Sequence, residues 1–407
     1  MNVLKQLFID FNAYFASCEQ HMRPELIGRP IAITPVATES GCCIAASYAA
    51  KARGVKVGTR VREARMLCPD VVIVEARPDQ YVRLHHELNA IIEQCISVTQ
   101  VCSVDEVRCE LNGHWQEPDF AIGVAREIKA RLVDFSPALR CSIGIAPNAY
   151  LAKTASEMQK PDGLVTLTGL EVPGKLIEYG MEMDDLCGIG HQMTTRLNNY
   201  GVYTIEHLYA LSRDRMRAIW RGVEGERMWF RLRGYEVEQP PTKRSCFGHS
   251  HVLPPALRNE AKSHAVLSKL IQKAAFRLRR EGYFCGCLGV QVQFYDAPTW
   301  QVNQGFDKTQ STQCLLEHFA RLWEQRPSIK APFAVSVNLT SLESTAQHTP
   351  TLWSGDREHR EHRLDSAVDT LNRAYGSRAL FRASAMEAID SAPTRIPFSH
   401  VPQDDEW

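Results

Sequence analysis

Two adjacent acids, Asp105 and Glu106, lie inside a run that otherwise favours a β-strand, VCSVDEVRCEL over residues 101–111. Charges are usually kept out of such runs, because removing an unpaired carboxylate from water is costly. Alternation of side chains along a strand offers one explanation, with one acid facing the core and the other facing water. A bound cation offers another. The choice between these two explanations depends on the rest of the chain.

A third acid, Asp10, ends the apolar strand-like run LFID and precedes an aromatic-rich helix start. Alone, it suits the N-cap of that helix. Three carboxylates from two strands repel one another unless divalent cations neutralise them, and hard oxygen ligands suit Mg²⁺. Two such ions about 3.5 to 4 Å apart would activate an attacking hydroxyl and stabilise a leaving phosphate. The three acids therefore indicate phosphoryl or nucleotidyl transfer.

The pattern of apolar residues divides the chain, whose 407 residues suffice for about two to four domains. Residues 1 to 165 alternate strand-like and helical patterns, which is typical of an α/β or α+β fold. Residues 166–237 read as short helices, and a second mixed segment follows residue 245. Its last helical pattern ends at Gly376, which we expect to be a C-cap followed by a short strand.

The location of the chain is predicted to be cytoplasmic, without a membrane partner. No apolar run approaches the roughly 18 residues needed to cross a bilayer, and MNVLKQLFID lacks a signal-peptide layout. The 13 cysteines include no CxxC pair answered by a second one, which argues against a zinc site. We expect buried, reduced thiols.

Positive charge is concentrated in one part of the chain. The formal net charge is zero, which by itself argues against a nucleic-acid partner. Between residues 241 and 300, however, there are nine basic and three acidic residues. Most of the basic ones lie in the helical pattern RNEAKSHAVLSKLIQKAAFRLRREG. On this pattern alone, a solvated helix face explains the charge as well as a DNA-binding face.

Four segments resemble, in order and spacing, the motifs of the Y-family translesion DNA polymerases of the bacterial polymerase IV and V type: DFNAYFASCE, ASYAAKARGVKVG, SVDEV and SIGIAPNAYLAKTASEMQKPDGL. The first is particularly similar to the catalytic subunit of polymerase V. The resemblance implies an α+β multidomain fold, a right-hand polymerase with palm, fingers, thumb and little finger. The implied parts are palm, 1–10 and 77–165; fingers, 11–76; helical thumb with a helix-hairpin-helix, 166–237; linker, 238–245; α/β little finger, 246–385; and mobile tail, 386–407.

The same resemblance assigns roles to residues. Asp10, Asp105 and Glu106 would be catalytic and would bind two Mg²⁺ ions, for which Mn²⁺ can substitute, with the Phe11 main-chain carbonyl as a further ligand. Phe15 would be the steric gate, whose ring occupies the space that a ribose 2′-hydroxyl needs. The other positions implied for the incoming nucleotide and the templating pair are Tyr14, Tyr48, Lys51, Lys160, Cys42 and Ile44. Lys51 stands where many members carry Arg, and it lacks the bidentate fork of Arg.

DNA contacts are implied in two places. Gly188 and Gly190, in LCGIG, would leave main-chain N–H groups near a helix start to bind a backbone phosphate. Lys243 and Arg244, in the linker, would contact phosphates as well. The resemblance also favours a DNA-binding role for the basic helical pattern, although in relatives the sheet opposite this helix usually enters the groove.

The function implied is template-directed, low-fidelity DNA synthesis past damaged template bases, without proofreading. The implied partners are primer-template DNA, a dNTP and the replication sliding clamp, with the chain acting as a monomer or in a complex with accessory proteins. Two alternatives remain. A catalytically silent relative acting as an adaptor would typically lack the three carboxylates, and a palm-type nucleotidyl cyclase should lack the helix-hairpin-helix and the basic C-terminal domain.

Overall fold

The chain forms two compact units, each with its own hydrophobic core. Described residues up to Glu238 belong to the first unit, and those from Lys243 to Ala392 belong to the second. Within this described part of the chain, no helix is long and apolar enough to cross a membrane. The computed structural model describes residues 3–35, 38–39, 41–238, 243–327, 331–349, 355–376, 379–392 and 401.

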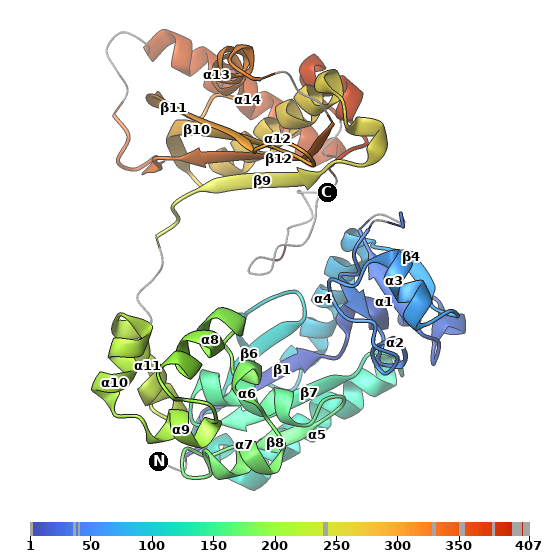
Figure 1. The fold of residues 1–407 in the computed structure, drawn as a ribbon, viewed down its shortest axis with the longest axis vertical. Coiled ribbons are helices and arrows are strands. Elements are labelled where there is room, and N and C mark those ends of the chain that lie inside the picture. The colour runs from blue at the N-terminus through green and yellow to red at the C-terminus, as the bar shows by residue number, and fades with distance from the viewer. Residues whose placement is uncertain are drawn as a thin grey trace. The chain divides into compact units, whose positions relative to one another are not determined.

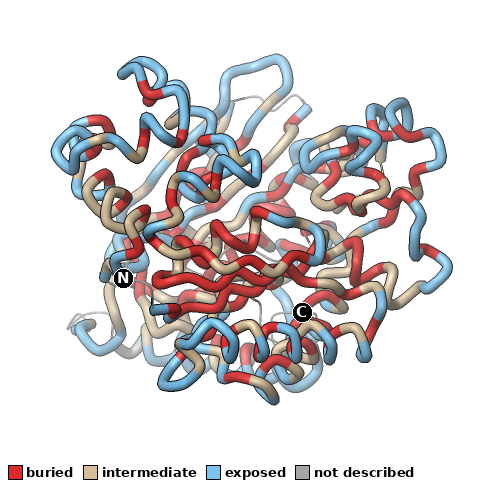
Figure 2. The backbone as a smooth tube through the Cα atoms, turned by 90° about the horizontal axis from the view of Figure 1, so that it is seen from below, coloured by how far each residue is buried: buried red, intermediate tan, exposed pale blue. Residues whose placement is uncertain are grey.

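The first unit is built on a five-stranded sheet (Figure 1). In spatial order its strands are β5 (Val98–Val101), β6 (Glu106–Glu110), β1 (Gln6–Phe11), β7 (Cys141–Ala146) and β8 (Leu164–Thr166). The two neighbours of β1 run antiparallel to it, and every residue of β1 is buried. Figure 2 shows the resulting concentration of buried backbone, in red, in the strands.

Helices cover both faces of this sheet. Phe8 packs in one core with α6 (Ala149–Met158), so the side chains that alternate with it, Leu7 and Ile9, face the other side. There, α4 (Pro78–Glu93) and α5 (Pro118–Phe135) contact the sheet and each other. Because Asp10 lies two residues after Phe8, its side chain belongs to the face covered by α6.

A close approach of backbones holds α6 against the sheet. A Cβ atom added to Gly144 of β7 would lie 2.0 Å from the carbonyl oxygen of Ala152 and 2.4 Å from the nitrogen of Ser156. Contacts this short do not occur between real atoms, so only glycine lets α6 lie so near the strand.

A smaller three-stranded sheet, β3 (Ala45–Ala46), β2 (Ile31–Thr34) and β4 (Val72–Glu75), follows β1 in the chain. Its two small cores include residues of the surrounding helices. These helices are α1 (Tyr14–Met22), η1 (Pro24–Leu26), α2 (Tyr48–Lys51) and α3 (Val61–Leu67).

After β8 the first unit is entirely helical up to Leu232. Its short elements share one core with α6. They are α7 (Gly174–Glu178), η3 (Met183–Asp185), α8 (His191–Asn199), α9 (Ile205–Ala210), α10 (Arg213–Trp220) and α11 (Val223–Leu232). The remaining short helix of this unit, η2 (Gly113–Gln116), precedes α5.

The second unit is an antiparallel sheet with helices packed against it (Figure 1). In spatial order its strands are β11 (Trp300–Thr309), β10 (Tyr283–Phe294), β12 (Pro332–Thr340) and β9 (Phe247–Val252), and β13 (Glu343–Ser344) also pairs with β10. The helical elements are η4 (Pro255–Leu257), α12 (Glu260–Arg280), α13 (Thr312–Glu324), α14 (Gly355–Tyr375) and η5 (Ala383–Ala388).

The C-terminal part of the second unit differs from two expectations. The described residues 379–382 after Gly376 form no strand, and η5 follows them. Residues 386–392, expected to begin a mobile tail, instead pack against α12, because Ala388 and Ala392 are buried in its core. The rest of the predicted tail, apart from residue 401, lies outside the described residues.

Candidate active site

Strand register brings two of the predicted metal ligands face to face. Asp10, near the end of β1, pairs directly with Glu106, the first residue of β6. Directly opposed residues of an antiparallel pair share one face, and like charges placed this way destabilise the sheet unless something neutralises them. The neighbouring acid, Asp105, is tied to the same strand end, because its carbonyl oxygen accepts a hydrogen bond from the Phe11 N–H at 2.9 Å.

Two of the three predicted acids lie together with a third acid that was not predicted. Among the described residues, carboxylate oxygens of Asp10, Glu106 and Glu157 all lie within 4.8 Å of one another. Asp105 is not in this group, and its carboxylate accepts a hydrogen bond from the Ser103 hydroxyl at 2.6 Å. Glu157 comes from α6 and escaped the sequence analysis.

Two lysines neutralise the carboxylates. The Nζ atom of Lys160 lies 2.8 Å from Asp10 and 2.8 Å from Glu157. The Nζ atom of Lys153 lies 2.6 Å from Glu106. The sequence analysis did not predict Lys153 as a site residue, although the spacing of residues 153, 157 and 160 is typical of one face of a helix.

Burial makes the charge on Asp10 costly. Its side chain is only 9% exposed, and this burial is the main reason that the pKa of Asp10 rises to about 7, with Glu157 and Asp105 adding to the rise and Lys160 opposing it. Burial also opposes the charge on Lys160, but the carboxylates of Asp10 and Glu157 outweigh it and raise the pKa of Lys160. Burial and the neighbouring carboxylates therefore oppose the charge on Asp10, and Lys160 favours it.

The predicted steric gate is held by an aromatic stack. The ring of Phe15 stacks on Tyr81 of α4, with ring centroids 4.7 Å apart and planes 17° apart. The Tyr14 hydroxyl donates to the Tyr81 carbonyl at 2.7 Å, and the Tyr81 hydroxyl donates to Glu19 at 2.8 Å. Tyr14 is thus buried in the support of the gate.

Glu19 anchors this support although its side chain is fully buried. Arg77 binds it through two hydrogen bonds of 3.0 and 2.6 Å, and Arg23 pairs with it as well. Burial opposes ionisation of Glu19, but the hydrogen bonds from Arg77 and Arg23 prevail and lower its pKa. Glu19 and Tyr81 were not singled out in the sequence, because no spacing rule links residues 62 positions apart.

The loop of the smaller sheet carries the remaining predicted nucleotide contacts. Tyr48 and Lys51 lie on α2, with the Lys51 ammonium 4.7 Å from the centre of the Tyr48 ring. Ile44 is half-buried, and its N–H donates to the Ile33 carbonyl at 2.8 Å. Cys42 is exposed, and its backbone forms an isolated antiparallel β-bridge with that of Arg60.

Of the predicted DNA contacts, the two glycines lie just before α8, Gly188 in a turn and Gly190 in extended backbone. Gly188 has φ of +85°, a conformation that favours glycine, and Gly190 is the N-cap of α8. Lys243 and Arg244 are both exposed. Arg244 is already paired, with Glu281 at 2.9 Å and with the ring of Phe247 at 4.8 Å.

Several basic residues of α12 have structural partners. Lys269 donates to the Ile389 carbonyl at 2.6 Å, and Lys273 donates to the Ala392 carbonyl at 3.0 Å. The side chain of Arg279 is 8% exposed and makes two hydrogen bonds, of 2.7 and 2.8 Å, to Asp369 of α14. These three charges therefore hold the C-terminal segment and α14 in place, and the expected DNA-binding role of the helix stays a prediction.

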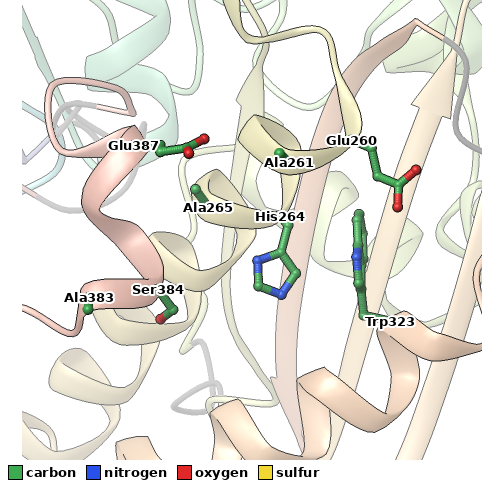
Figure 3. Close-up of a pocket in the computed structure, with 8 residues that line it drawn as sticks. All are labelled: Glu260, Ala261, His264, Ala265, Trp323, Ala383, Ser384 and Glu387. Carbon is green, nitrogen blue, oxygen red and sulfur yellow. The ribbon is translucent and has the colours of Figure 1, made fainter.

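The second unit also contains a cavity of about 420 Å³ between α12, α13 and η5 (Figure 3). His264 lies beside Trp323 in it, and burial followed by the nearby Arg326 lowers the pKa of His264. Glu260, at its rim, pairs with Arg326. The residues that line this cavity include none of the site residues that were predicted from the sequence.

Comparison with known proteins places these features in a family. The sequence model of the impB/mucB/samB family matches residues 9–157, and that of the family's C-terminal domain matches residues 244–352. The chain is 31% identical over 395 residues to a DNA polymerase IV of Moorella thermoacetica, a match covering 93% of this chain and 96% of the relative. The chain belongs to the Y family of DNA polymerases. A second relative, DNA polymerase IV 1 of Bacillus subtilis, is 25% identical over 401 residues, covering 96% of this chain and 95% of the relative.

Solved structures show the same fold. A Y-family chimera named Dbh-Dpo4(243-245)-Dbh matches with a TM-score of 0.68 at 22% identity, covering 83% of this chain and 98% of that one. The insertion ternary complex of Dbh DNA polymerase matches with a TM-score of 0.55 at 22% identity and the same coverage. The expected family and the right-hand α+β polymerase fold are thereby confirmed.

Proposed function

We propose that this Y-family member is a template-directed, low-fidelity DNA polymerase that extends primers past damaged template bases by two-metal nucleotidyl transfer, without proofreading. The observation that carries the proposal is the cluster of Asp10, Glu106 and Glu157, whose carboxylate oxygens lie within 4.8 Å of one another where α6 packs on the sheet. Relatives that cover nearly the whole chain are named DNA polymerase IV, which supports the same reaction.

The residues present fit divalent cations. Hard carboxylate oxygens are clustered, and the raised pKa of Asp10 marks a buried charge that is poorly compensated without a cation. We assign two Mg²⁺ ions, replaceable by Mn²⁺, to Asp10, Asp105 and Glu106 with the Phe11 carbonyl. When bound, the ions would supply a lowered pKa for the primer 3′-hydroxyl and neutralise charge on the leaving pyrophosphate.

The chain's own residues bind and orient the substrates. Lys160, a point charge beside Asp10, would pair with the triphosphate once cations take over the carboxylates, and Lys153 would be released from Glu106 in the same way. Tyr48 donates a hydrogen bond to the triphosphate, and Lys51 adds a second charge. Phe15, fixed by its stack on Tyr81, excludes a ribose 2′-hydroxyl.

The remaining assignments follow the same reasoning. Tyr14 supports the nucleotide site by holding Tyr81. Cys42 and Ile44 cover the templating pair. The DNA contacts that we propose are Gly188, Gly190, Lys243 and Arg244.

We also propose domain limits and partners. The limits are 1–10 and 77–165 for the palm, 11–76 for the fingers, 166–237 for the thumb, and 246–385 for the little finger, extended to 392 because this segment packs on α12. Primer-template DNA and a dNTP are the proposed substrates, and a fold neighbour described as an insertion ternary complex supports them. A sliding clamp is the proposed partner.

Primer extension tests the proposal. The purified chain with Mg²⁺ should add nucleotides to a primer opposite an undamaged template and opposite an abasic site, and it should leave a mismatched 3′ end uncut. Asp105→Ala should abolish the addition. A chain that adds nothing, or an Asp105→Ala variant with unchanged activity, would refute the polymerase function. Excision of the mismatched nucleotide would refute only the absence of proofreading.

A further inference from the structure

The turn that follows α6, formed by residues 160–163, is held by a buried asparagine that has no role in the proposed reaction. Asn12 is 3% exposed, and its Oδ1 atom accepts a hydrogen bond from the Asp162 N–H at 2.6 Å. Its Nδ2 atom donates to the Ser142 hydroxyl at 3.0 Å, and that hydroxyl accepts a hydrogen bond from the Gly163 N–H at 3.2 Å. One side chain and its serine partner thus bind two successive N–H groups of the turn.

A lysine holds the same turn from α5. The Nζ atom of Lys129 donates to the Asp162 carbonyl at 2.9 Å and to the Asp162 carboxylate at 2.5 Å. It also donates to the Cys141 carbonyl of β7 at 2.7 Å, so it joins the turn to the sheet. Asp162 has φ of +57°, a left-handed conformation that is unfavourable for most residues other than glycine. These hydrogen bonds hold the turn in that conformation.

The 160–163 turn contains Lys160, which pairs with Asp10, and Asn12, which binds the turn, is close to Asp10 in the sequence. Asn12 follows Asp10 by two positions, and its own N–H donates to the Arg140 carbonyl at 2.8 Å, which fixes it against the neighbouring chain segment. The turn therefore links Asn12 to Lys160, whose Nζ atom lies 2.8 Å from the Asp10 carboxylate.

We propose that Asn12 is a positioning residue that fixes the 160–163 turn, and with it Lys160, for the triphosphate of the incoming nucleotide. The inference rests on the proposed function of Lys160. Loss of the Asn12 side chain leaves the Asp162 N–H without its partner and frees the turn, so Lys160 samples positions from which it cannot meet the triphosphate. Nucleotide binding should weaken more than the chemical step, because the metal-binding carboxylates stay on their strands.

The test compares single-nucleotide incorporation by the full chain and its variants. Asn12→Ala should raise the KM for dNTP by about fivefold or more while kcat changes less than about twofold. Asn12→Asp keeps an oxygen that accepts from the Asp162 N–H and should restore the KM to within about twofold of wild type. Lys129→Met should raise the KM for dNTP as well. Because the Lys129 side chain is 18% exposed, this substitution should destabilise the protein less than Asn12→Ala. Asn112→Ala, at an exposed asparagine, is the control and should leave both constants unchanged.

A double-mutant cycle separates positioning from general damage. If Asn12 acts through Lys160, Asn12→Ala should add little to the KM of a Lys160→Ala variant. A binding readout accompanies the kinetics: dNTP with Mg²⁺ should raise the melting temperature of wild type and Asn12→Asp, and should raise that of Asn12→Ala much less.

Three results would overturn the inference while leaving the polymerase function intact: an unchanged KM in Asn12→Ala, a multiplicative effect in the cycle, or an Asn12→Asp variant as impaired as Asn12→Ala. A wild-type chain that extends no primer would instead refute the function on which the inference rests.

Discussion

Replacing Asp10 by asparagine should stabilise the metal-free protein while abolishing its activity. Burial raises the pKa of Asp10 from 3.8 to about 7. Because the pKa of Asp10 is higher in the folded protein than in the unfolded chain, the free energy of unfolding falls as the pH rises from 3.8 to about 7. At pH 8 the shift of about three units corresponds to roughly 4 kcal/mol of lost stability.

The neutral amide introduced by Asp10→Asn resembles the protonated carboxyl group and avoids this loss, in which the attraction between Asp10 and Lys160 is already included. The gain is therefore up to about 4 kcal/mol, or roughly 8 to 16 °C in the melting temperature of the first unit.

Calorimetric melting at pH 8 in EDTA measures this gain. Mg²⁺ should stabilise the wild type and so reduce the difference in melting temperature between the two proteins. At pH 5, where Asp10 is protonated in the folded protein, the higher melting temperature of Asp10→Asn should also approach that of wild type. Asp134→Asn, at an exposed acid, is the matched control and should change little at either pH. An Asp10→Asn variant that melts below wild type at pH 8 in EDTA would refute the assignment of Asp10 as a destabilised buried charge.

Three further predictions concern the gate, the packing of α6 and acid sensitivity. Phe15→Ala should raise ribonucleotide incorporation by about tenfold or more in primer extension, and unchanged sugar discrimination would remove the gate assignment. Gly144→Ala should cost about 3 kcal/mol or more, because its Cβ atom would lie 2.0 Å from the Ala152 carbonyl oxygen; a melting temperature equal to wild type would contradict this. Burial lowers the pKa of His85 from 6.5 to about 4, so its contribution to stability is present above pH 6.5 and is lost as the pH falls towards 4. His85→Gln should therefore lose less melting temperature than wild type between pH 7 and pH 5, and an equal loss would show that His85 titrates normally.

Local pattern was sufficient to single out two of the clustered acids in the sequence. Asp10 and Glu106 stand at strand positions in recognisable motifs, and the structure pairs them directly in register. Lys153 and Glu157 were missed because their helical spacing shows a common face but not which surface that face meets. Only the close packing of α6 at Gly144 settles that they meet Asp10 and Glu106.

The predictions for the basic helix and for the stretch after Gly376 had one weakness in common. Charge and apolar content do not show which distant residues a side chain contacts. Lys269 and Lys273 suggested a nucleic-acid face, yet their ammonium groups bind carbonyls more than a hundred residues away in the chain. The stretch after Gly376 contains Leu380 and Phe381, which suited a strand, but both are exposed and η5 follows. Long-range hydrogen bonds and burial of this kind appear only once the second unit is assembled.

The central claim is that the carboxylates on β1 and β6 hold the cations that drive nucleotide addition. The most direct measurement is the rate of single-nucleotide incorporation at saturating dNTP, as a function of Mg²⁺, for wild type and Glu106→Gln. We predict that the wild-type rate rises with Mg²⁺ and is lost in EDTA, and that Glu106→Gln is slower by about a hundredfold or more at every Mg²⁺ concentration. Equal rates for the two proteins, or wild-type incorporation that persists in EDTA, would contradict the account.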